Sequence, residues 1–271
     1  MKYRMTSFIA KLVLASVGAF LISSSQDSTG GSSPDVEKLL RQGRAMQKDG
    51  KYLLAAQTFR SIQSSIADSS QQAEAIYRFV SCGDAEAKRM GINSTPDSLR
   101  QVESFRAIGI NLVYLDRFER WSNADTSSRQ LLASTYSKTS WGEEAAYDLI
   151  SDEVSPYGAP EIEDPRIVRD RAFAFLNKYP ASKFKFDATH LLGLALQDIW
   201  NFAISGSGSE FVTESEQKNP EAVRSGAIQA LSSVVRHRKH LLKTKWEYPD
   251  KTVLKYLRRR EETPYGFFCC C

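Results

Sequence analysis

Apolar residues recur at helical spacing in two consecutive stretches that begin at Pro34. Ser33 can cap a helix whose first position is Pro34, and Asp49-Gly50 is expected to end it. The first apolar stripe comprises Leu39, Leu40, Gly43 and Met46. The second comprises Tyr52, Ala55, Ala56, Phe59 and Ile62. Because so few residues separate the stripes, the two helices are predicted to pack antiparallel.

Further helical patterns continue the first region, 35–150. One helix is expected over 70–82. From Pro96 the apolar residues step by three or four, which predicts one long helix that ends near Trp121. A short helix over Trp141–Ile150 closes this region. The sequence therefore predicts helix pairs and no strand.

The second half of the chain is divided by Pro, Gly and acidic residues. Three prolines and five acidic residues interrupt the pattern between Ser151 and Pro165. Asp164-Pro165 and Asn219-Pro220 each resemble a helix start, with a capping side chain before a proline. The predicted segments are an acidic loop over 151–165, a helical hairpin over 166–204, a linker over 205–219, a basic helical region over 220–262 and a tail over 263–271.

Two motifs resemble known helical repeats. The string Gly43-x-x-Met46, Gly50-Lys51-Tyr52, Ala55, Phe59 and Ile62 is similar to the tetratricopeptide pattern, in which a glycine admits the partner helix. Tyr179-Pro180-x-Ser182 resembles junctions in repeat proteins of the bacterial envelope, such as outer-membrane assembly and Tol-Pal coordination factors. The glycines Gly43 and Gly193 are not separated by whole periods of about 34 residues. The resemblance thus implies an all-α fold in which antiparallel helix pairs stack as a short, irregular tetratricopeptide-like solenoid.

The N-terminal residues have the pattern of an export signal. Three basic residues are followed by a short apolar run, Leu12 to Ile22, and small residues come next. Residues 1–25 are therefore predicted to be a signal peptide and 26–34 a flexible tether. The protein is expected to be exported to the periplasm or secreted. An uncleaved N-terminal membrane anchor is the alternative.

Positive charge is concentrated near the C-terminus. The chain has a net charge of +4, and Arg236 to Arg260 holds ten Lys or Arg residues against two acidic residues, a local +8. Lys239, Lys243 and Lys245 are the candidate contacts for an acidic protein face, with peripheral membrane contact also open. No nucleic-acid partner is expected. An ordinary solvated helix face is the alternative interpretation.

The histidines and cysteines of the sequence match neither a metal site nor a disulfide framework. His237 and His240 lie three apart, and His190 is the only other histidine. No carboxylate or cysteine cluster accompanies them, so no metal or cofactor is predicted. Cys82 is isolated and Cys269 to Cys271 stand at the end, which is not the framework of a disulfide-rich domain.

The leading functional hypothesis is a non-catalytic scaffold that binds a protein or peptide in the envelope. Tyr114, Phe118 and Trp121 are expected in the core, and become candidates for a partner surface where they are exposed. A divergent enzyme that acts on cell-wall polymer is the alternative. Its site would combine the acidic residues Glu161 to Asp164 with His190.

Overall fold

The computed structural model describes residues 34–63, 68–91, 95–116, 120–150, 164–206, 208–242 and 250–263. All of them belong to one compact unit, Ser32–Cys271. The predicted signal peptide, residues 26–33 of the tether, residues 151–163 of the acidic loop and residues 264–271 of the tail lie outside the described residues.

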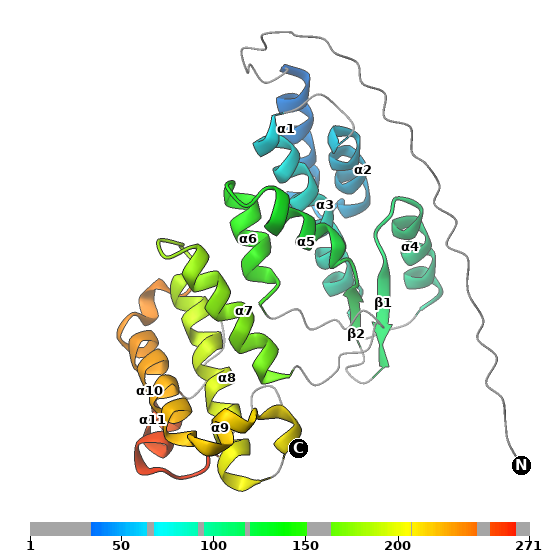
Figure 1. Ribbon diagram of the computed structural model, residues 1–271. Coiled ribbons are helices and arrows are strands. Elements are labelled where there is room, and N and C mark those ends of the chain that lie inside the picture. Colours follow the sequence, from blue (N-terminus) through cyan, green and yellow to red (C-terminus); the bar gives the residue numbers. More distant parts are fainter. Residues whose placement is uncertain are drawn as a thin grey trace, which may run out of the picture. The chain divides into compact units, whose positions relative to one another are not determined.

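The described part of the chain is mostly helical, with packed helix pairs and one two-stranded antiparallel sheet (Figure 1). The first half contains α1 (Pro34–Lys48), α2 (Tyr52–Gln63), α3 (Ser69–Met90), α4 (Pro96–Ala107), β1 (Leu112–Leu115), β2 (Arg120–Asn123), α5 (Ser127–Thr135) and α6 (Ser140–Asp148). The second half contains α7 (Pro165–Lys178), α8 (Lys185–Ser205), η2 (Ser209–Phe211), α9 (Glu214–Lys218), α10 (Pro220–Arg236), η3 (Arg238–His240) and α11 (Asp250–Arg259). The coarse expectation of a helical protein is confirmed.

Helices α1 and α2 form the predicted pair, and Gly50 makes the turn between them. Gly50 has φ +74°, its N–H donates to the carbonyl of Gln47, and the N–H of Lys51 donates to the carbonyl of Met46. These are the two hydrogen bonds of a Schellman motif, which a glycine in left-handed conformation closes. The prediction that α1 ends at Asp49-Gly50 is confirmed.

The predicted long helix from Pro96 to Trp121 is wrong. Helix α4 ends at Ala107, and Gly109, with φ +86°, closes a second Schellman motif in which Gly109 donates to Arg106 and Ile110 to Phe105. The chain then forms the hairpin β1–β2, in which Tyr114 faces Trp121. The apolar spacing of this region suits a helix, but Gly109 stops the helix and the following residues are strand formers.

The hairpin packs on α3 at a position where that helix has no side chain. A Cβ atom on Gly83 would lie 2.7 Å from both Asn123 Nδ2 and Ile110 Cγ2. The same Nδ2 donates hydrogen bonds to the Val80 carbonyl and the Asp84 carboxylate, both at 3.1 Å. Helix α3 also extends beyond the predicted range, since it begins after the capping residue Asp68 and continues to Met90.

The second half is built around α8, which packs against α7 and α10. Trp200 on α8 is 1% exposed and is among the largest fully buried side chains. A Cβ atom on Gly193 would lie 2.7 Å from a methyl of Leu231 and 3.3 Å from the Cβ of Ala230. The absence of a side chain at Gly193 and the small side chain of Ala230 therefore allow α8 and α10 to approach closely. Asp164-Pro165 and Asn219-Pro220 begin α7 and α10 as predicted.

The segment 205–219 is packed and partly helical, which corrects the expectation of a linker. Phe211 in η2 contacts Phe202 of α8, with ring centroids 5.4 Å apart, and Val212 is buried. Thr213 and Glu216 then form a capping box that starts α9. Gly206 and Gly208, both with φ +72°, supply the left-handed residues where the chain leaves α8.

Candidate functional site

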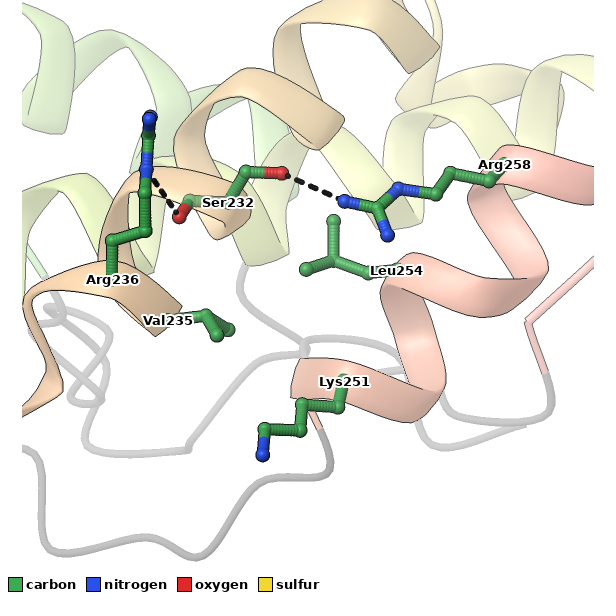
Figure 2. A pocket seen from close by; sticks show the side chains of 6 residues that line it. All are labelled: Ser232, Val235, Arg236, Lys251, Leu254 and Arg258. Carbon is green, nitrogen blue, oxygen red and sulfur yellow. Dashed lines mark hydrogen bonds between the residues drawn. The ribbon is translucent and has the colours of Figure 1, made fainter.

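A groove lies between α10 and α11, and each helix contributes one face to it (Figure 2). The contributing residues stand at i, i+3 and i+4 on α10 and at i, i+3 and i+7 on α11, which places each set on one face of its helix. The groove has a volume of about 530 Å³, within the range of about 300–1,000 Å³ typical of ligand sites. Its lining residues are Ser232, Val235 and Arg236 on α10 and Lys251, Leu254 and Arg258 on α11.

Apolar contacts hold α11 beside α10 and thereby form the groove. Val253, Leu254 and Leu257 are buried in the same core cluster as residues of α8 and α10. Arg224 of α10 adds a polar contact, since its Nη1 donates to the carbonyl of Leu257 at 2.8 Å. The opposite face of α11 carries Lys255, which is exposed. The amphipathic pattern of this helix thus buries one side and leaves its cations at the groove and in solvent.

Arg236 and Arg258 contact Ser232 of α10 from different sides (Figure 2). Arg236 Nε donates to the carbonyl of Ser232 at 3.3 Å, and Arg258 Nη2 lies 3.5 Å from Ser232 Oγ. Figure 2 shows Arg258 reaching across from α11 toward the serine hydroxyl. Lys251 lies two helical turns before Arg258, and Leu254 lies between them along α11. The groove therefore has cations at both ends and apolar side chains between them.

Several arginines of the second half form ion pairs with acidic side chains, whereas the three groove cations do not among the described residues. Arg224 pairs with Glu221, and Arg169 pairs with Glu216. Within the described residues, Arg236, Lys251 and Arg258 form no ion pair, and the contacts of the two arginines are with Ser232. Among the described residues, these three cations therefore face no carboxylate.

A buried polar network fixes the chain that follows α11. Gln197 Nε2 and Asn201 Nδ2, both on α8, donate to Thr263 Oγ1 at 2.8 Å and 2.6 Å. The backbone N–H of Thr263 donates in return to Asn201 Oδ1 at 3.1 Å. Thr263 is 5% exposed. The network ties the C-terminal end of α11 to the core helix and so supports one wall of the groove.

The structure separates the candidate residues named from the sequence. Trp121 is 7% exposed and belongs to the core of the first half, and its ring meets that of Tyr114 edge to face at 5.2 Å. Tyr114 is partly buried against the same cluster. Lys239 is exposed on η3 and does not line the groove. Phe118, Lys243 and Lys245 lie outside the described residues.

Asp164 and His190 are the two residues of the alternative enzyme site that the structure describes. Asp164 caps α7, because its Oδ1 accepts a hydrogen bond from the Arg166 N–H. His190 is 1% exposed inside the core on α8. His237 and His240 stack on Phe186, with centroids 4.5 Å and 5.6 Å from its ring. Among the described residues, no group of three or more His, Cys, Asp or Glu side chains is arranged to hold a metal ion.

Within the described residues, no helix combines the length and apolar character needed to cross a bilayer.

Comparison of the chain with known protein families, with curated proteins and with solved structures gave no match.

Sequence reasoning identified the basic stretch but not the residues that form the groove. Ser232, Val235 and Arg236, and likewise Lys251, Leu254 and Arg258, have the spacing of a single helix face. From that spacing, two helix faces that each combine cationic and apolar residues could have been predicted. Their meeting depends on tertiary packing between helices separated by residues 237–249, which spacing does not reveal.

Proposed function

We propose that this protein is a non-catalytic binding module that holds an acidic segment of a partner protein in the groove between α10 and α11. The observation that carries the proposal is the set of three cations, Arg236, Lys251 and Arg258, that surround apolar side chains without ion-pair partners among the described residues. Such a surface complements carboxylates, and its charge would steer an acidic chain toward it.

A peptide segment suits this groove better than a small inorganic anion does. Val235 and Leu254 give it apolar surface, and the methylene stems of Lys and Arg add to that surface beside their charges. An inorganic anion would use the cations and leave the apolar surface uncovered. A protein segment can use both.

The proposal also covers where the protein acts and how its helix pairs are stacked. The basic residues and apolar run at the N-terminus favour export, so the partner would be met in the envelope or outside the cell. The close α1–α2 pair supports a tetratricopeptide-like stacking of helix pairs as the scaffold. N-terminal sequencing of the exported form tests the first point, with a new start near Gln26 expected.

The binding proposal is tested with a defined acidic probe, polyglutamate of about 20 residues, against the full chain. A groove variant carries Arg236→Glu, Lys251→Glu and Arg258→Glu. The matched control carries Lys239→Glu, Lys243→Glu and Lys245→Glu, which changes net charge equally. The wild type and the control should bind with affinity that weakens as salt rises, and the groove variant should bind at least tenfold more weakly.

Three outcomes would overturn the proposal. Equal loss in both triple variants would show that the whole basic face acts without a groove. Absence of polyglutamate binding by the wild type at low salt would remove the acidic partner. Binding to vesicles rich in phosphatidylglycerol, without binding to polyglutamate, would assign the basic segment to a membrane surface. Far-UV circular dichroism establishes that both variants keep their helices.

A further inference from the structure

We infer that the groove recognises an extended segment of the pattern acidic–x–apolar–x–acidic, an inference that rests on the binding function proposed above. The pattern follows from the order of side chains along the groove. Arg258 reaches the hydroxyl of Ser232 at one end, Lys251 lies at the other, and the apolar side chains lie between. The occupant then has an anion at each end and an apolar side chain in the middle.

The spacing of the groove cations suits an extended chain. Lys251 and Arg258 are seven residues apart on α11, so their Cα atoms are separated by about 10 Å along the helix axis. In an extended peptide, residues i, i+2 and i+4 point to the same side, and i and i+4 are about 13 Å apart. Long Lys and Arg side chains can cover the remaining difference.

The middle position of the occupant lies over Val235 and Leu254. Leu254 is 4% exposed and Val235 is partly exposed, so the floor is already ordered by the core before a ligand arrives. An ordered apolar floor favours one apolar side chain at the central position. Charge alone would bring many acidic chains to the groove, whereas this contact would select among them.

Arg258 sets the preference at its end of the groove. A guanidinium presents two parallel N–H groups that match a carboxylate, and Arg258 offers them beside the Ser232 hydroxyl. Lys251 at the other end offers a single charge on a flexible stem. We therefore expect the acidic residue at the arginine end to contribute more to affinity than the one at the lysine end.

The test uses four nine-residue peptides that carry a fluorescent label, measured by anisotropy against the full chain. The parent peptide is Ser-Gly-Glu-Ser-Leu-Ser-Glu-Gly-Ser. The first control replaces Leu with Ser and keeps the charge, and the second replaces both Glu with Gln and keeps the apolar residue. The third moves Leu by one position, which keeps the composition and turns Leu to the opposite side of an extended chain.

The parent peptide should bind about tenfold more tightly than each control, a factor consistent with loss of one buried apolar contact or of the charge pairs. Binding of the parent should also fall with Val235→Ser, while the Leu→Ser peptide should be insensitive to that substitution. Equal affinity of the parent, the Leu→Ser peptide and the shifted peptide would overturn the pattern. If polyglutamate still bound to the groove in that case, the proposed function would stand without the pattern. If neither polyglutamate nor the parent peptide bound, the proposed function and the pattern would both be overturned.

Discussion

A Cβ atom on Gly43 would lie 2.6 Å from Cε1 of Phe59, a separation that real Cβ atoms do not adopt. Gly43 therefore lets the ring of Phe59 fill the space that a side chain on α1 would occupy. Phe59 is fully buried and belongs to the core cluster of the first half. This contact was expected from the sequence, which placed a small residue of one helix opposite a large residue of the next.

Gly43→Leu should overpack the α1–α2 contact. The clash is expected to lower the free energy of unfolding by about 1–3 kcal/mol, partly offset because Leu favours a helix over Gly by roughly 1 kcal/mol. Thermal unfolding measures the effect. Ala45→Leu is the control, because Ala45 is exposed on the same helix. A Gly43→Leu protein that melts with the wild type would contradict the close crossing as a source of stability.

Helix ends were predicted well where a glycine or proline fixes the backbone. Asp49-Gly50, Asp164-Pro165 and Asn219-Pro220 each bound a helix as expected. The failure came at Gly109, which was placed within an apolar helical stripe although it ends α4. Periodicity alone could not distinguish a continuing helix from a hairpin whose apolar residues also face a core.

The basic segment that contains the candidate site could be located from the sequence, but the residues that line the groove could not. The excess of cations from Arg236 to Arg260 is visible in the sequence. Which cations act together depends on the burial of Val253, Leu254 and Leu257, because that burial turns Lys251 and Arg258 toward α10. Long-range packing of this kind leaves no mark in local spacing.

Glu74 should make the stability of the first half depend on pH. Burial alone would raise the pKa of this carboxyl, but hydrogen bonds and charge from Arg44 and Arg78 outweigh it and hold the pKa below the usual 4.5. A lowered folded-state pKa adds stability that is fully present above pH 4.5 and is lost as pH falls through the folded-state value. Urea unfolding at pH 7 and at pH 3 measures the difference.

Glu74→Gln removes that contribution, leaves Arg78 without the Glu74 carboxylate, and leaves Arg44 paired with Glu37 alone. We expect a loss of about 2–3 kcal/mol at neutral pH, with a smaller decrease on acidification than in the wild type. Glu103→Gln is the control, because Glu103 is exposed on α4. If the Glu74→Gln and wild-type proteins lost stability in parallel between pH 7 and pH 3, Glu74 would not be a source of the pH dependence.

Cys82 should be unreactive in the folded protein. Burial raises the pKa of its thiol to about 12, and the side chain is fully enclosed by the core of the first half. The nucleophile is the thiolate, so at pH 8 the folded protein offers almost none of it. In a variant with Cys269, Cys270 and Cys271 replaced by serine, a disulfide reagent should modify Cys82 only as fast as the core opens. Rapid modification without denaturant would contradict the burial.

Thr263 is expected to keep α11 in place, and through it the groove. Its hydroxyl oxygen accepts hydrogen bonds from Gln197 and Asn201, and all three side chains are buried. Thr263→Val preserves shape but removes the acceptor for two amide groups, which should cost about 1–3 kcal/mol. The cost should appear locally, as faster amide hydrogen exchange over α11, and as weaker binding of the parent peptide. Thr263→Ser keeps the hydroxyl and should retain both properties. Suppose instead that Thr263→Val bound the peptide as well as the wild type and that amide exchange in α11 were unchanged. The buried network would then contribute nothing to the position of Lys251 and Arg258. The apolar contacts of α11 alone would hold that wall of the groove.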